Sequence, residues 1–223
     1  MSDIVAALSR FRESIPNNVT LVAVSKTKPL EDLQEAYDHG QRHFGENKIQ
    51  EMTHKWEELP KDIHWHMIGH TQRNKVKYMA PYVHLIHGVD SPRLLKEINK
   101  QAKKNERVID CLLQVHIARE DSKFGFDNDE LLEFLKSEAF NSYKNLRIKG
   151  LMGMATFTDD KQQVREEFQE LHKLYTAIKN EHIDTHKHSF EELSMGMTGD
   201  YEIAIEEGST MIRIGSAIFG ARD

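Results

Sequence analysis

The chain has 223 residues, of which 39% are hydrophobic and 30% are charged, and its formal net charge is -6. This length supports one substantial hydrophobic core, and the acidic balance leaves no global basic field that would attract nucleic acid or an anionic membrane. Because no apolar run approaches the roughly 18 residues of a membrane span and the first residues lack a secretory pattern, we expect a cytoplasmic protein with residues 1–223 in one domain.

Strand-like and helix-like segments alternate along the whole chain. A leading helix is predicted over residues 2–12. Short apolar or β-branched runs then predict eight strands, at residues 20–24, 42–46, 64–69, 83–89, 108–117, 147–155, 191–196 and 211–215. Amphipathic patterns predict helices between them, at residues 31–40, 47–59, 71–80, 91–105, 127–140, 161–182 and 199–208.

This alternation indicates the fold class. Strands separated by crossover helices imply parallel pairing, and eight such units in a chain of this size predict an α/β protein built as a single (β/α)8 TIM barrel after an N-terminal helix. A doubly wound parallel sheet is the alternative. A barrel takes its reactive groups from the C-terminal ends of its strands and from the loops that follow, so residues at those places are the first functional candidates.

Lys26 stands at such a place, two residues after the end of the first predicted strand at Val24. Partial burial disfavours the ammonium form of a lysine and leaves a neutral amine that can condense with an aldehyde. The alternative is an ordinary loop lysine whose stem packs while its ammonium stays in water. Lys28 is a competitor, but it immediately precedes Pro29 and fits a surface loop better.

Two turns of small residues follow the last two predicted strands, at 194–199 and at 215–216. Barrels commonly bind phosphate there, because glycine lets the backbone N–H groups approach the anion and serine hydroxyls add donors. Short Gly/Ser turns are also common without a ligand. Taken with a lysine at a strand end, the two turns favour a small phosphorylated aldehyde.

Arg213 lies inside the last predicted strand, among apolar residues. A buried arginine needs a partner, and one of the many acidic residues could supply it. The functional alternative is a guanidinium that donates to a ring nitrogen. Since arginine does not release its proton, it would keep a pyridine nitrogen unprotonated, and such a ring is a poor electron sink.

Histidines and the lone cysteine give weaker patterns. The stretch HWHMIGH contains His64, His66 and His70, but no cysteine or carboxylate pattern nearby completes a tetrahedral set, so we predict no metal site there. Cys111 lies in an apolar run and is expected to be buried and unreactive. Residues 122–126 are interpreted as a turn that could line the barrel mouth. The histidines His182, His186 and His188 are interpreted as part of a solvated connection between a helix and a strand.

Longer motifs run from end to end: VAVSKTKP, HFGENKIQE, IHWHMIGHTQRNK, GLMGMAT and LSMGMTGDYEIAIEEGSTMIRIGSAIFGAR. In these motifs the chain resembles the pyridoxal phosphate homeostasis proteins, which are similar to the N-terminal barrel of fold-type III alanine racemases. The resemblance implies pyridoxal 5'-phosphate as cofactor and Lys26 as the lysine of its Schiff base. It also implies that Asn47 lies beside the cofactor ring and that Arg213 faces the pyridine nitrogen, whereas Ser194, Gly215 and Ser216 hold the phosphate. His70 and Thr71 depart from the family pattern, which affects contacts at the mouth.

Two functions follow from this resemblance. The first is a cofactor-binding homeostasis protein without substrate turnover, whose partners would be cofactor-dependent apoenzymes. The second is an amino acid racemase or a related enzyme, which would need an acid or base on each face of the cofactor. Fold-type III racemases take the second base from another domain, and the chain ends after the barrel, so we expect the first function, no catalytic residues and a monomer.

Overall fold

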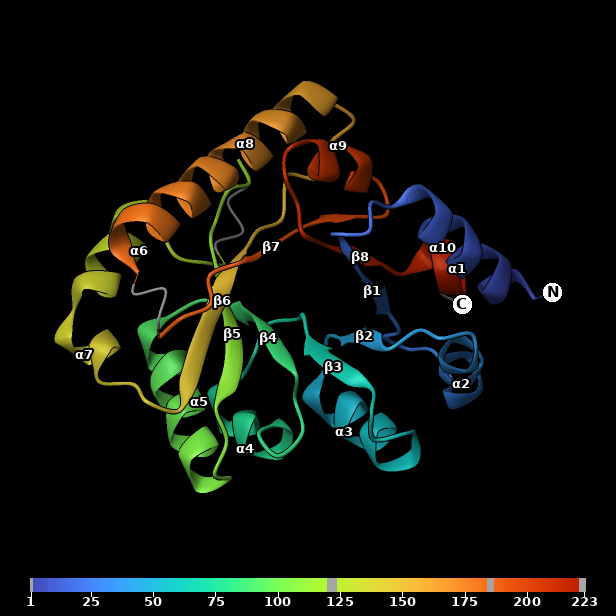
Figure 1. Ribbon diagram of the computed structural model, residues 1–223, viewed down its shortest axis with the longest axis horizontal. Helices are drawn as coiled ribbons and strands as arrows, with labels where there is room; N and C mark the ends of the chain where they lie inside the picture. The colour runs from blue at the N-terminus through green and yellow to red at the C-terminus, as the bar shows by residue number, and fades with distance from the viewer. Residues whose placement is uncertain (1, 120–123, 184–186, 221–223) are drawn as a thin grey trace.

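The computed structural model describes residues 2–119, 124–183 and 187–220. Eight parallel strands close into a barrel, and their order around it follows the chain from β1 to β8 (Figure 1). The barrel closes where β8 pairs with β1, with Arg213 opposite Val22 and Ile214 opposite Ala23. The predicted (β/α)8 barrel is therefore confirmed.

The strands are short, and helices surround them (Figure 1). The strands are β1 (Thr20–Val24), β2 (His43–Glu46), β3 (His64–Met67), β4 (Leu85–Val89), β5 (Ile109–Gln114), β6 (Leu146–Met152), β7 (Glu192–Met197) and β8 (Met211–Ile214). The helices are α1 (Asp3–Ser14), α2 (Leu30–Asp38), α3 (Ile49–Glu58), η1 (Arg73–Lys75), α4 (Val76–Met79), α5 (Pro92–Lys104), α6 (Asn128–Lys136), α7 (Glu138–Asn141), α8 (Lys161–Ala177), η2 (Ile178–His182), α9 (Tyr201–Glu206) and α10 (Ser216–Phe219). In the described part of the chain, none of these helices combines the length and apolar character that crossing a membrane requires.

Several helices differ from the predicted ones. The helix expected over 127–140 is divided at Ser137, whose hydroxyl accepts from the Phe140 N–H and so begins α7. Residues 71–80 form only the short η1 and α4. The chain after β8 turns at once into α10, which no sequence pattern predicted, and α10 contacts α1, so the first and last described elements lie together (Figure 1).

The barrel interior is partly polar. Most apolar side chains form one large cluster between strands and helices, whereas a second, small cluster consists of Val22, Leu85, Leu112, Met152 and Met211. The strands also carry buried polar side chains, among them His66, His87, Ser194 and Arg213. Buried polar groups are stable only when they find hydrogen-bond partners, and these four are joined in one connected series.

Candidate functional site

A cavity of about 410 Å³ opens at the C-terminal ends of the strands. This is the end at which barrels place their binding groups. Five of the six residues predicted to bind the cofactor line this cavity: Lys26, Asn47, Arg213, Gly215 and Ser216. The sixth, Ser194, is not among the lining residues. Tertiary structure thus brings together residues from both ends of the chain, from Lys26 to Ser216.

Lys26 is placed by a strained turn. The next residue, Thr27, has a φ of +66°, in the left-handed region that β-branched residues rarely adopt. The Thr27 N–H donates to Glu51 Oε1 over 2.6 Å, and this bond holds the turn to helix α3. The backbone on the C-terminal side of Lys26 is therefore fixed by a side chain from a different βα unit.

The N-terminal side of Lys26 is fixed by a buried polar cluster. Ser25 donates through its hydroxyl to Glu46 Oε1 over 2.7 Å, and Lys55 Nζ donates to the Ser25 carbonyl over 2.7 Å. Lys55 Nζ also lies 2.8 Å from Glu46 Oε1 and 2.7 Å from Glu51 Oε1. The ammonium of Lys55 thus joins both sides of the turn that carries Lys26.

Burial of the Glu46 carboxylate in this cluster is energetically unfavourable. Its side chain is inaccessible to solvent, and its Oε2 atom has no hydrogen-bond partner among the described residues. Burial raises the pKa of Glu46 to about 6, although the neighbouring ammonium of Lys55 acts in the opposite direction. The carboxylate is therefore held in place by Lys55 and Ser25 against a considerable desolvation penalty.

Asn47 is positioned by a close backbone approach. A Cβ atom at Gly69, on the loop after β3, would lie 2.5 Å from the Asn47 carbonyl oxygen and 2.8 Å from its Cα. Only glycine fits there without displacing Asn47. Gly215 is similarly confined, because a Cβ atom at this residue would lie 3.2 Å from the Val24 carbonyl oxygen. These two glycines let the chain pass close to the strands beside the cavity.

Within the described residues, Arg213 donates to a serine hydroxyl and to a backbone carbonyl, and no salt bridge joins it to an acidic side chain. Its Nη1 donates to Ser194 Oγ over 2.6 Å and its Nη2 to the Gly153 carbonyl over 3.1 Å. Burial lowers the pKa of Arg213 to about 10, while the charge of Asp200 raises it. The guanidinium remains protonated at neutral pH, so it presents N–H donors and no acceptor to the cavity.

Ser194 lies lower in the barrel than the sequence pattern suggests. It is inside β7, fully buried, with its hydroxyl between Arg213 and His87. β7 extends to Met197, so the first hydroxyl beyond the strand is that of Thr198, which lines the cavity. Thr198 belongs to the predicted turn 194–199, but the sequence analysis did not name this residue. The position of this hydroxyl after the end of the apolar strand could have indicated it.

The other candidates take different roles. His70 lies at the cavity, with its Nδ1 3.1 Å from Asp90 Oδ2 and its ring near Phe124. Cys111 is buried, as predicted, and burial raises the pKa of its thiol. His188 is not solvated as expected: it is buried, and its Nδ1 accepts from the Ile148 N–H over 3.1 Å. Three candidates lie outside the described part of the chain, namely Ser122, His186 and the side chain of His182.

Comparison with known proteins identifies the family. The family described as "Alanine racemase, N-terminal domain" matches residues 2–223. A protein of Aquifex aeolicus named pyridoxal phosphate homeostasis protein is 39% identical over 207 residues, which cover 92% of this chain and 88% of that protein. The chain belongs to the pyridoxal phosphate homeostasis protein family.

Solved structures agree with this assignment. PipY of Synechococcus elongatus, solved with PLP bound, is 33% identical and has a TM-score of 0.88, with 97% of this chain and 100% of PipY covered. Alanine racemase from Bartonella henselae has a TM-score of 0.73 at 15% identity, and this chain covers 61% of it. The racemase therefore shares the barrel fold with the pyridoxal phosphate homeostasis protein family, and this likeness carries no statement about activity.

Proposed function

We propose that this chain binds pyridoxal 5'-phosphate in the cavity at the C-terminal ends of the strands and serves the intracellular homeostasis of this cofactor, without turning over a substrate. The observation that carries the proposal is that Lys26, Asn47, Arg213 and the turn 215–216 line one cavity of about 410 Å³. The relatives named above support it, because they bear the name pyridoxal phosphate homeostasis protein or were solved with PLP bound.

The donor set of the cavity fits the chemical groups of this cofactor. A cavity of this size lies in the usual range for small ligands. Two primary amines, two aliphatic hydroxyls and a guanidinium share it, on Lys26, Lys28, Thr198, Ser216 and Arg213. An aldehyde requires an amine, a phosphate requires N–H and O–H donors, and an aromatic nitrogen with a lone pair requires a donor. We treat residues 1–223 as one cofactor-binding domain.

Each residue has a defined task in this proposal. When bound, the cofactor supplies an aldehyde that condenses with a primary amine and releases water, and Lys26 is the amine at the fixed turn. Ser216 and Thr198 supply hydroxyl donors for the phosphate, and the tightly placed Gly215 supplies a backbone N–H. Ser194 supports the site from below through Arg213. Asn47 lies beside the ring, held by its contact with Gly69.

Arg213 is the residue that favours binding over catalysis. Its protonated guanidinium can donate to a ring nitrogen but cannot give up a proton to it. An unprotonated pyridine nitrogen accepts electrons poorly, so the site is ill suited to remove the α-proton of an amino acid. An amino acid racemase-like enzyme is therefore the second candidate; the solved alanine racemase shares the barrel fold with this chain at 15% sequence identity.

The mouth of the cavity supports transfer of the cofactor to apoenzymes in the cytoplasm. Phe124 and Met154 line the cavity and are 51% and 40% exposed. They give the mouth an apolar rim that a receiving protein could cover. The other exposed large apolar side chains in the described ranges are Tyr78, Val108 and Phe157, which lie far apart in the sequence, and this supports a monomer.

Borohydride reduction tests the proposal. Reduction of the protein loaded with pyridoxal 5'-phosphate should fix the cofactor to the peptide that contains Lys26, as peptide mapping by mass spectrometry would show. Lys26→Ala should abolish the fixed adduct, whereas Lys28→Ala should retain it. An undiminished adduct in Lys26→Ala would assign the linkage to another lysine, and a loaded wild-type protein without visible absorption would contradict cofactor binding.

A second assay separates the two candidate functions. The purified yellow protein should not exchange the α-hydrogen of L-alanine with deuterium, because Arg213 withholds a proton from the ring. The exchange can be followed by proton nuclear magnetic resonance in deuterium oxide, with a bacterial alanine racemase as the positive control. Rapid exchange that disappears in Lys26→Ala would establish the enzymatic alternative.

A further inference from the structure

Five histidines gather at the opposite, N-terminal side of the barrel from the cofactor cavity. They come from three adjacent strands: His43 begins β2, His64 and His66 lie in β3, His84 immediately precedes β4, and His87 lies within β4. The register of β2 and β3 places His43 opposite His64, and that of β3 and β4 places His66 opposite Leu85. The proposed cofactor site uses none of these side chains as a lining group.

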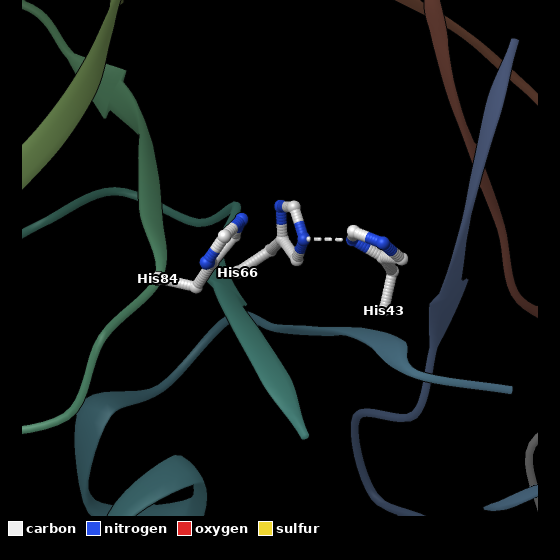
Figure 2. Close-up of side chains that lie close together, drawn as sticks. All are labelled: His43, His66 and His84. Carbon is white, nitrogen blue, oxygen red and sulfur yellow. Dashed lines mark hydrogen bonds between the residues drawn. The ribbon is translucent and has the colours of Figure 1, made fainter. Parts of the chain in front are cut away.

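Three of the imidazoles converge on one point. One nitrogen each from His43, His66 and His84 lies within 4.8 Å of the other two (Figure 2). His43 Nδ1 and His66 Nε2 are 2.9 Å apart, and the ring centres of His66 and His84 are 5.4 Å apart. Figure 2 shows His66 between the other two rings, with His43 and His84 on either side. In the described part of the chain, this is the one group of three or more histidine, cysteine or acidic side chains whose potential ligand atoms all lie within 4.8 Å of one another.

We propose that His43, His66 and His84 form a binding site for a divalent transition metal ion of the zinc type at the N-terminal end of the barrel. Zinc–nitrogen bonds of 2.0–2.1 Å in a tetrahedral site separate two ligand nitrogens by roughly 3.3 Å. His43 Nδ1 and His66 Nε2, which are 2.9 Å apart, must therefore separate slightly, and the His84 nitrogen must move toward them. His43 is half-buried and His84 is exposed, so both have room to turn toward the buried ring of His66.

The buried ring of His66 also has the second hydrogen bond that metal-bound histidines usually make. Its Nδ1 lies 2.9 Å from His87 Nε2, and His87 Nδ1 lies 2.9 Å from Ser194 Oγ. With Nε2 on the ion, His66 must carry its hydrogen on Nδ1 and donate to His87. His87 then donates to Ser194, whose oxygen also accepts from Arg213. A bound ion would therefore fix which atom donates in each hydrogen bond of the series from His66 through His87 and Ser194 to Arg213.

The surroundings select the class of ion. Asp110, which lies opposite Leu85 in the register of β4 and β5, accepts two 2.8 Å hydrogen bonds from Arg147. Magnesium and calcium prefer oxygen ligands, and the three imidazoles offer only nitrogen. Imidazole nitrogens suit zinc, nickel, cobalt and copper. His64 stacks on His84 with ring centres 4.3 Å apart, and both residues are exposed. A water molecule or the His64 imidazole can therefore supply the fourth ligand of the ion.

Metal titration of the full-length protein, free of any polyhistidine tag, tests the site. Calorimetry with zinc chloride after chelator treatment should show one saturable ion per chain. Cobalt(II) should give the intense visible bands of a four-coordinate nitrogen site, and zinc should displace it. His84→Gln and His43→Gln should each weaken zinc binding by at least about tenfold, because each removes one of three ligands. His54→Gln, a change of an exposed histidine on α3, should bind zinc like the wild type.

Two results would overturn the proposal: no saturable zinc binding, or equal binding by His84→Gln and His54→Gln. Circular dichroism must confirm that the variants fold, and His84 is the safer position because it is exposed whereas His66 is buried. Lys26→Ala should bind zinc as tightly as the wild type, because Lys26 lies at the other end of the barrel. The metal site and the cofactor site can therefore fail independently.

Discussion

Arg213 Nη1 donates to Ser194 Oγ over 2.6 Å and so ties β8 to β7 beneath the cofactor cavity. The same hydroxyl faces His87 Nδ1 at 2.9 Å. Together with the Gly153 carbonyl, this buried serine determines where the guanidinium that faces the cavity points.

Ser194→Ala should destabilise the protein by about 1.5–3 kcal/mol, because it removes a buried hydrogen bond to a charged group. It should also change the visible spectrum of the bound cofactor, since the guanidinium of Arg213 loses one of its two acceptors. Urea unfolding and absorption spectra would measure these effects. The control is Ser142→Ala, at an exposed serine, which we expect to change stability by less than about 0.5 kcal/mol. Equal behaviour of the two variants would contradict the supporting role of Ser194.

Gly69→Ala should weaken cofactor binding. The new methyl group would lie 2.5 Å from the Asn47 carbonyl oxygen, so the loop that carries Asn47 must move. We expect a loss of about 1–3 kcal/mol in the free energy of unfolding, as in other overpacked sites, together with faster cofactor release.

The matched control for that change is Gly199→Ala, because a Cβ atom at Gly199 meets nothing within 4 Å. It should leave stability within about 0.5 kcal/mol of the wild type. Dilution of the loaded protein, followed by fluorescence, would report the release rates of both variants. Release that is equally slow in Gly69→Ala would show that the position of Asn47 is unimportant for binding.

Lys55→Met should be among the most destabilising single changes in this chain. It leaves the buried Glu46 without its ammonium partner, and breaking such a pair costs about 3–5 kcal/mol. It also frees the Ser25 carbonyl and Glu51, so the turn that carries Lys26 should loosen. The double variant Glu46→Gln with Lys55→Met should recover part of the loss in thermal or urea unfolding. No recovery would mean that the cost comes from packing and not from the isolated carboxylate.

The pH dependence of stability should report Glu46. Its pKa is about 6 in the folded state against an ordinary value of 4.5, so between these values the folded state binds more protons than the unfolded state. Stability contributed by this group must then fall as pH rises from about 4.5 to about 6, by roughly 2 kcal/mol in total. The groups that face the carboxylate are Lys55, Glu51 and the hydroxyl of Ser25.

Comparison of wild type with Glu46→Gln isolates this contribution. The difference between their free energies of unfolding, measured in urea at several pH values, should decline across that window and be flat above it. In Lys55→Met the upper end of this window should move to higher pH, because the ammonium that lowers the folded-state pKa of Glu46 is absent. A difference that does not vary between pH 4.5 and 6 would show that burial does not perturb this carboxyl group.

The sequence by itself determined the barrel and most of the candidate site. Alternating strands and helices with short connections allow few closed arrangements other than eight parallel strands. Since parallel strands present their C-terminal ends at the same side, the sequence pattern alone places Lys26 and Gly215 at the same end of the barrel. Asn47 was named from the family resemblance.

Tertiary structure alone decided contacts that depend on register and strand length. Whether Ser194 or Thr198 reaches the cavity depends on where β7 ends, and apolar periodicity does not define that residue. The histidine cluster joins His43 to His66 and His84, which lie on neighbouring strands and share no spacing pattern along the chain. Hydrogen bonds across strands depend on the stagger of the closed barrel, and this stagger arises only when all eight strands pair.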